Sequence, residues 1–324
     1  MQIITKDPLR EAAEKASEGR QTVLRTSNGY PSYFNVIPAF KCEEISDSMG
    51  TCLHPAFVVN GVEKSQIFIG AYQAIISNGQ ALSLPFQNPK TNINFDAARA
   101  ACLAAGPGFH MLTNWEWAAV ALWMIRNGYS NTRGNTSYGK SHSNPDEVGI
   151  PSGEGGKILT GSGPDTWRHD HSAYGIADLI GNVWEWVDGL KLAEGRVVMP
   201  SDNNFALAES EWPDSGAVIN GKDGIQVSNK ITKRGWLDTP FEKITAKEKQ
   251  SLPVSVNQAL LCPCDGSRGV PGHVWADNSQ GFEALPIRGG NWVGGADAGL
   301  ASLYLRFQRS LSRSVIGFRP AFIE

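Results

Sequence analysis

The sequence of 324 residues has few of the features that mark membrane-spanning, secreted or nucleic-acid-binding proteins. No apolar run approaches the roughly 20 residues that a membrane-spanning helix needs, and residues 1–20 lack the apolar centre of a signal peptide. The 29 basic and 32 acidic residues give a net charge of −3, without the positive excess that bulk nucleic-acid binding requires. We therefore expect synthesis in the cytoplasm, with any virion or cell-surface location reached by non-classical export.

Cysteine is also scarce, with five residues at positions 42, 52, 102, 262 and 264. An odd number scattered over a long chain does not fit a disulfide framework, so reduced thiols are expected. Cys262 and Cys264 are separated by one residue, whereas zinc and redox motifs place two residues between their sulfurs. A metal or redox role for this pair is therefore disfavoured.

Charged residues make up only 19% of the chain and hydrophobic residues 41%, which predicts a folded core. Residues 94–106 begin at the capping residue Asn94, are rich in Ala and end at Gly-Pro, which predicts a helix. Thr113 and Glu116 fit a capping box in front of an apolar stripe that ends before Gly128, which predicts a second helix. Residues 7–19 carry a thinner stripe, typical of a surface helix.

The rest of the chain is dominated by short strands and turns. The predicted strands cover residues 33–37, 56–59, 66–72, 183–187 and 300–307. Residues from about 190 to 284 have no helical period and many Asn, Asp, Gly, Ser and Pro, so they form a long insertion. Helices among many short strands indicate a mixed α+β domain.

Four motifs occur along the chain in a fixed order. They are Leu112-Thr-Asn-Trp-Glu-Trp-Ala-Ala119, Tyr174-Gly-Ile-Ala-Asp-Leu-Ile-Gly-Asn-Val-Trp-Glu-Trp186, Arg288-Gly-Gly-Asn-Trp292 and Gly317-Phe-Arg-Pro320. Together they resemble the formylglycine-generating-enzyme superfamily, a variant of the C-type lectin fold. The resemblance implies an α+β domain over residues 35–324, with two helices, short antiparallel strands and long irregular insertions, after an N-terminal extension over residues 1–34.

The superfamily contains metal oxidoreductases, whose catalytic residues can be compared position by position. Formylglycine-generating enzymes carry two copper-binding cysteines after the Arg-Gly-Gly motif, whereas residues 291–299 contain no cysteine. The histidine triad of the iron-dependent sulfoxide synthases is not present either. His169-Asp-His171 could place two imidazoles on one side of a strand, although a polar surface loop is the favoured interpretation. We therefore expect that the chain is not an enzyme.

The end of the chain resembles one branch of the superfamily. Residues 287–322 are similar to the variable region of the proteins that diversity-generating retroelements diversify. In those systems a reverse transcriptase randomises template adenines, commonly in Asn AAC codons, which cannot become Trp, Gln, Glu, Lys or Met. Between residues 291 and 315 only Trp292 and Gln308 belong to those excluded types, so the segment is compatible with that mechanism. The resemblance implies a hypervariable ligand-binding protein, such as a phage receptor-binding protein or a surface adhesin.

Alternation in this segment indicates which side chains would meet a ligand. Leu303 and Leu305 can point inward while Ser302, Tyr304 and Arg306 point to the opposite face of the strand. Matching the family pattern gives the variable, ligand-facing set as Asn291, Val293, Gly294, Asp297, Ser302, Tyr304, Arg306, Phe307, Arg309, Leu311, Arg313 and Val315. The structural set is Trp184, Trp186, Arg288, Gly289, Gly290, Trp292, Gly317 and Arg319.

The expected ligand is a protein or glycan on a cell surface. The segment from Arg288 to Glu324 contains five arginines against two acidic residues, which favours an anionic ligand. No cofactor is required, although structural calcium bound by loop oxygens stays open. Two alternatives remain: a metal oxidoreductase of the superfamily, and a calcium lectin of fixed specificity whose usual Glu-Pro-Asn and Gln-Pro-Asp motifs are absent.

Overall fold

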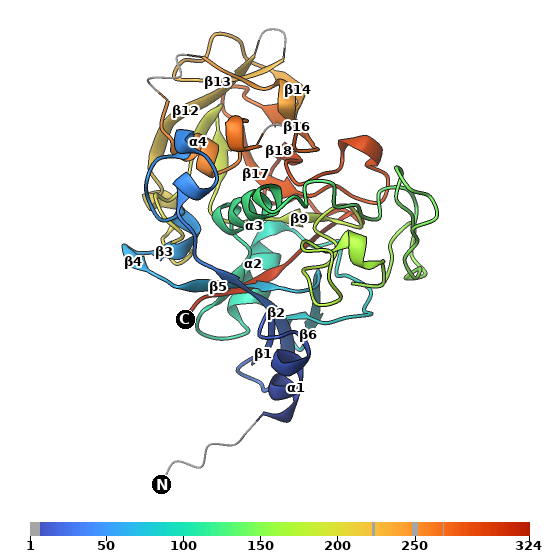
Figure 1. Ribbon diagram of the computed structural model, residues 1–324. Helices are drawn as coiled ribbons and strands as arrows, with labels where there is room; N and C mark the ends of the chain where they lie inside the picture. Colours follow the sequence, from blue (N-terminus) through green and yellow to red (C-terminus); the bar gives the residue numbers. More distant parts are fainter. Residues whose placement is uncertain (1–6, 222–223, 248–251, 268) are drawn as a thin grey trace.

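The computed structural model describes residues 7–221, 224–247, 252–267 and 269–324, and it is mostly β with few helices (Figure 1). The α-helices in this part of the chain are α1 (Pro8–Ala16), α2 (Phe95–Leu103), α3 (Asn114–Arg126) and α4 (Ser255–Gln258). No helix within the described ranges is long and apolar enough to span a bilayer.

One sheet joins the two ends of the chain. Its five antiparallel strands lie in the order β1 (Gln21–Arg25), β2 (Pro31–Pro38), β5 (Gln66–Gly70), β20 (Pro320–Phe322) and β8 (Phe109–Met111). The C-terminal strand β20 therefore lies between two strands, β5 and β8, that come from residues 66–111. The expected boundary between residues 34 and 35 falls inside β2, whose whole length pairs with β5 or β1.

The larger sheet carries the C-terminal segment. Its main path is β14 (Trp236–Pro240), β16 (His273–Asp277), β18 (Leu303–Phe307), β17 (Glu283–Arg288), β10 (Lys191–Ala193), β11 (Arg196–Val198), β12 (Asp214–Gly221), β13 (Ile225–Ser228) and β15 (Thr245–Ala246). Off this path, β9 (Trp184–Trp186) pairs with both β17 and β19 (Ile316–Phe318). The segment 190–284 thus supplies most of the sheet, and two strands from it, β14 and β16, lie on one side of β18.

Two separate hairpins complete the strands: β3 (Val58–Val59) with β4 (Val62–Glu63), and β6 (Ala74–Ser77) with β7 (Gln80–Ser83).

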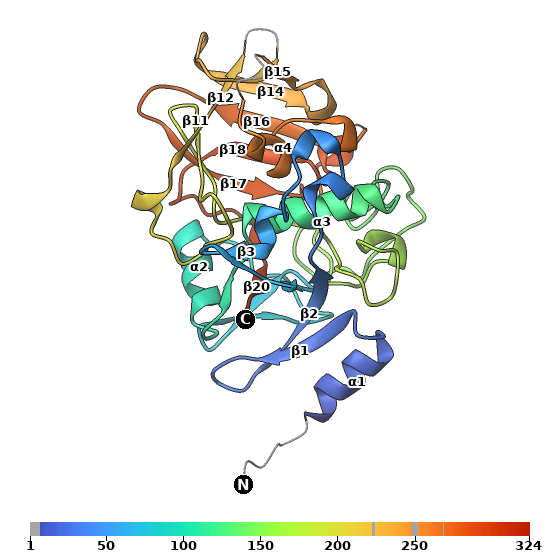
Figure 2. The ribbon, with the colours of Figure 1, turned by 60° about the vertical axis from the view of Figure 1, so that its left-hand side comes forward.

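The two principal helices begin where their capping residues predict. The Asn94 side chain accepts a hydrogen bond from the Ala97 amide at the start of α2. At the start of α3 the Thr113 hydroxyl accepts from the Glu116 amide, and the Glu116 carboxylate accepts from the Thr113 amide. Ten of the thirteen residues of α3 are buried. Figure 2 shows α3 crossing the molecule below β17, and the helix shares one hydrophobic cluster with Leu303 and Leu305 of β18.

Four of the five predicted strands are shorter than the sequence pattern indicated, and two of these differences have a clear local cause. Residues 55–57 form a 3-10 turn because Pro55 starts it and the His54 ring accepts from the Ala56 amide, which leaves only Val58–Val59 extended. Residues 300–302 form a turn in which the Ser302 amide donates to Gly299, so β18 begins at Leu303.

The fold makes stability depend on pH through His54. Burial lowers the pKa of His54 to about 4, because the ring is fully enclosed beside Phe40, Phe57 and Trp115. The unfolded chain, with an ordinary His pKa near 6.5, therefore binds more protons between about pH 6.5 and 4, and this residue costs about 3 kcal/mol of stability as the pH falls through that range.

We expect the loss of unfolding free energy between pH 7 and pH 4.5, measured by urea titration, to be smaller in His54→Gln than in the wild-type chain. His142→Gln changes an exposed ring and serves as the matched control. An identical pH slope in all three chains would contradict the assignment.

Candidate ligand-binding surface

The predicted alternation along β18 is present. Leu303 and Leu305 are each 1% exposed and belong to the core beside α3. Tyr304 and Arg306 are half-buried and lie on the opposite face of the strand. The strand therefore buries one set of side chains in the core and leaves the other set half-buried on the opposite face.

Tyr304 belongs to a continuous group of rings on this outer face. Its ring centroid lies 5.5 Å from that of Trp275, 6.2 Å from that of Trp184 and 4.3 Å from that of Phe307. The parallel pairing of β16 with β18 places Trp275 directly opposite Tyr304. Trp236, on the edge strand β14, is 77% exposed. We call these five residues the aromatic surface.

The aromatic surface contains two tryptophans that the sequence analysis missed. Trp236 and Trp275 come from the segment 190–284, which had been interpreted only as an insertion. Buried tryptophans such as Trp115 and Trp117 donate their indole N–H to a backbone carbonyl. Within the described residues no acceptor is found for the indole N–H groups of Trp184, Trp236 and Trp275. These rings therefore offer both apolar area and hydrogen-bond donors to a partner.

Polar groups border the aromatic surface on the side of β14 and β16. The His273 ring stacks on Trp275 at 4.4 Å between centroids. Its Nδ1 lies 3.3 Å from an Asp297 carboxylate oxygen and its Nε2 lies 3.6 Å from an Asp238 oxygen. Both carboxylates are more than half exposed. Asp297, predicted as ligand-facing, is thereby placed next to residues of the insertion.

The arginines do not provide the free positive charge that the sequence suggested. Arg306 donates to the backbone carbonyls of Leu237 and Ala276 and lies over the Trp236 ring at 5.3 Å. Its guanidinium is also 3.7 Å from Asp238.

Arg309 is held by three carboxylates, those of Asp96, Glu209 and Glu283 at 2.8, 2.7 and 3.6 Å. Hydrogen bonding to Glu209 raises the pKa of Arg309, so its charge is retained and compensated inside the molecule. Of the three predicted ligand-facing arginines, Arg313 alone is exposed, whereas Arg306 and Arg309 are half-buried. The expectation of an anionic ligand therefore loses its main support.

Two predicted ligand-facing residues are buried. Ser302 is 0% exposed, and its hydroxyl donates to the Asp297 carbonyl at 2.6 Å because residues 299–302 turn before the strand begins. Asn291 is 7% exposed, and its side-chain oxygen accepts from the Val293 amide. Neither side chain lies where a ligand would reach it.

The other predicted positions lie at or near the surface. Val293 is 50% exposed, Asp297 and Arg313 are exposed, and Gly294 is half-exposed. Leu311 and Val315 are half-buried and pack, with Tyr304, Phe307 and Trp184, against a second hydrophobic cluster.

The residues predicted as structural are enclosed, except that Trp184 is half-buried. Arg288 is 0% exposed and donates twice to the Asn114 side-chain oxygen, at 3.0 and 2.7 Å, and to the Ala259 carbonyl. Burial lowers the pKa of Arg288 to about 9. Gly289 and Gly290 both have a φ of +91°, and a Cβ at Gly290 would lie 2.4 Å from the Cβ of Ala298. Only glycine fits this turn without strain.

Three further members of the structural set, Trp186, Trp292 and Gly317, pack closely against neighbouring backbone. Trp186 is fully buried and donates its indole N–H to the Ile93 carbonyl. Trp292 is 7% exposed, and its ring lies against Gly156, where a Cβ would approach within 2.3 Å. A Cβ at Gly317 would lie 2.6 Å from the Lys90 carbonyl oxygen.

Arg319 and Glu185 form a buried ion pair beneath the surface. The guanidinium donates to both oxygens of Glu185, at 2.9 and 2.6 Å, and to the carbonyls of Gly70 and Ala177. Both side chains are at most 1% exposed. Arg319 was predicted as structural, and the carboxylate of Glu185 is a charged partner that the sequence had not indicated.

The histidine pair does not converge. His169 accepts from the Ile176 amide, whereas His171 contacts the Thr132 hydroxyl. In the described ranges no three His, Cys, Asp or Glu side chains gather as a metal site would require.

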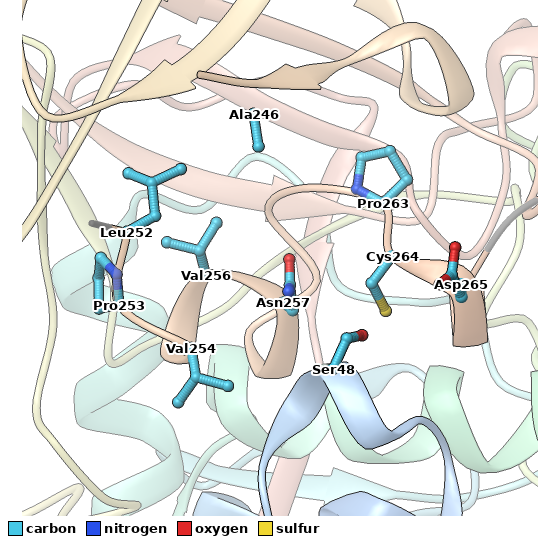
Figure 3. A pocket seen from close by; sticks show the side chains of 10 residues that line it. All are labelled: Ser48, Ala246, Leu252, Pro253, Val254, Val256, Asn257, Pro263, Cys264 and Asp265. Carbon is cyan, nitrogen blue, oxygen red and sulfur yellow. The ribbon is translucent and has the colours of Figure 1, made fainter. Parts of the chain in front are cut away.

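A cavity of about 250 Å³ lies elsewhere, beside α4 (Figure 3). Ser48, Val256, Asn257 and Cys264 are among its lining residues, and Figure 3 shows the Ser48 side chain together with side chains from the segment 246–265 around it. No predicted ligand-facing residue lines this cavity.

No protein-family model matches the chain, and no curated protein matches it. Among solved structures it is similar to Treponema denticola variable protein 1, with a TM-score of 0.36 and 13% identity over 93% of this chain and 98% of that chain. It is also similar to the P3c variant of the Major Tropism Determinant (TM-score 0.34, 12% identity, 90% and 62%) and to PvdO from Pseudomonas aeruginosa (0.32, 14%, 94% and 98%). The chain spans less than two thirds of the tropism determinant.

Because its ion pair is buried, replacing Arg319 should cost much more stability than replacing an arginine of an exposed ion pair. We expect Arg319→Met to lower the free energy of unfolding by about 3–5 kcal/mol, because it leaves the Glu185 carboxylate buried and unpaired. Arg196→Met removes an exposed ion pair with Asp214 and should cost about 0–1 kcal/mol. Denaturant titration of both variants measures the difference, and equal losses would show that Glu185 is compensated by other groups.

Proposed function

We propose that this chain is a hypervariable ligand-binding protein, that binding needs neither catalysis nor a cofactor, and that the ligand is a protein or glycan on a cell surface. The observation that carries the proposal is the aromatic surface. Tyr304 and Phe307, which belong to the segment resembling a variable region, lie there beside Trp184, Trp236 and Trp275. A phage receptor-binding protein or an adhesin would use such a surface.

The aromatic surface and its border combine residues of the segment that resembles a variable region with residues outside that segment. Tyr304, Phe307 and Asp297 lie in the segment where the family pattern places variation, whereas Trp236 and Trp275 lie outside it. Exposed tryptophan and tyrosine are enriched at binding hot spots because they bury large area at low entropic cost. We propose that the two tryptophans supply affinity that does not depend on which residues occupy the variable positions. The neighbouring variable residues then select the ligand.

The diversification part of the proposal is tested by the DNA that flanks the gene. We expect a near-copy of the segment encoding residues 291–322 next to a reverse-transcriptase gene, with differences confined to template adenines. Sequencing the flanks measures this directly. If the repeat is missing, a lectin-fold binder of fixed specificity replaces the hypervariable one.

The binding part is tested with a displayed library. Positions 293, 297, 304, 307 and 313 are randomised in the full chain and selected on immobilised lysozyme and, separately, on a mannose oligosaccharide. We expect binders to either probe, and Trp275→Ala introduced into them should weaken binding about tenfold or more. A control library at five exposed positions of α1 and β4 should give none. Equal yields from both libraries would rule out a dedicated surface.

A further inference from the structure

Two cysteines that are not part of the proposed binding surface lie next to each other. The Cys52 thiol donates to the Cys42 sulfur over 3.8 Å, and the two residues are ten positions apart. The backbone already aligns them. The Cys42 amide donates to the Cys52 carbonyl at 2.8 Å, and Lys41 and Leu53 form an antiparallel β-bridge. The sulfurs would have to approach by only about 1.8 Å to reach disulfide length.

The side chain of Gln258 contacts both sulfurs. The Gln258 amide nitrogen, from α4, lies 3.4 Å from the Cys42 sulfur and 3.3 Å from the Cys52 sulfur. It also donates to the Met49 carbonyl at 2.8 Å, which holds the amide in place. The thiols are therefore oriented by a neighbour that is neither a metal ligand nor a charged base.

The two thiols differ in access. Cys52 is exposed, whereas Cys42 is 0% exposed. Burial raises the pKa of the Cys42 thiol, and the adjacent Cys52 raises it further. Cys52 is thus the sulfur that an external reagent meets first, and Cys42 is the sulfur that follows.

We propose that Cys42 and Cys52 form an oxidation site at which a low-molecular-weight disulfide, of the oxidised glutathione class, closes an intramolecular disulfide. The Cys52 thiolate attacks one sulfur of the reagent, which forms a mixed disulfide and releases one thiolate. The released thiolate takes the proton of Cys42, and the Cys42 sulfur then attacks the Cys52 sulfur and releases the second thiolate. Two protein thiols are oxidised to one disulfide, and the reagent disulfide is reduced to two thiols.

The experiment treats the reduced full chain with oxidised glutathione and maps its peptides by mass spectrometry without reduction. We expect a Cys42–Cys52 linked peptide two hydrogens lighter than the reduced pair, and a rise of about 5 °C in the melting temperature, reversed by dithiothreitol. Cys52→Ser should show neither change. Cys264→Ser, which alters a buried thiol elsewhere, should behave like the wild-type chain.

Three outcomes overturn the proposal: a glutathione adduct that persists on Cys52, two thiols that stay unmodified, or a bridge to another cysteine. Alkylation with iodoacetamide before oxidation gives a second readout, since Cys52 should be labelled well before Cys42.

Discussion

The ion pair between Arg319 and Glu185 joins the two sheets of the molecule. Arg319 lies between β19 of the larger sheet and β20 of the five-stranded sheet, and Glu185 lies on β9. The same guanidinium donates to the carbonyl of Gly70 at the end of β5. Gln73 also donates to Glu185, so the carboxylate is satisfied from both sides. Because an unpaired charge is so costly in the interior, each of these groups fixes the position of the others.

That constraint positions the aromatic surface. Trp184 and Trp186 flank Glu185 on β9, and the pairing of β9 with β17 and β19 sets where they lie. Trp186 is directed into the core against Phe95, and half-buried Trp184 reaches the edge of the aromatic surface. A strand of three residues thus carries a buried charge between one half-buried and one fully buried indole.

The sequence was informative where the signal is local. The capping residues Asn94 and Thr113 fixed the starts of α2 and α3, because caps act within one helical turn. The period-2 pattern at residues 303–306 separated inward leucines from Tyr304 because a strand alternates regardless of its neighbours. The burial of Ser302 was missed because a turn before the strand breaks that alternation.

Partners distant in sequence could not be predicted in this way. The carboxylates that neutralise Arg309 come from residues 96, 209 and 283, and nothing near Arg309 in the chain indicates them. Trp236 and Trp275 reach the site only through the pairing of β14, β16 and β18, a register that no local pattern in the insertion specifies. The sequence pattern therefore missed Trp236 and Trp275, because their positions depend on pairing between strands that are distant in the chain.

The place of β18 between β16 and β17 has a genetic consequence. A strand paired on both edges needs its backbone N–H groups, so it accepts nearly any side chain on its open face but not proline. Randomised AAC codons include proline among their products. In a gene diversified by that route, some offspring would lose the fold rather than change ligand, and selection for a folded chain would act before selection for a target.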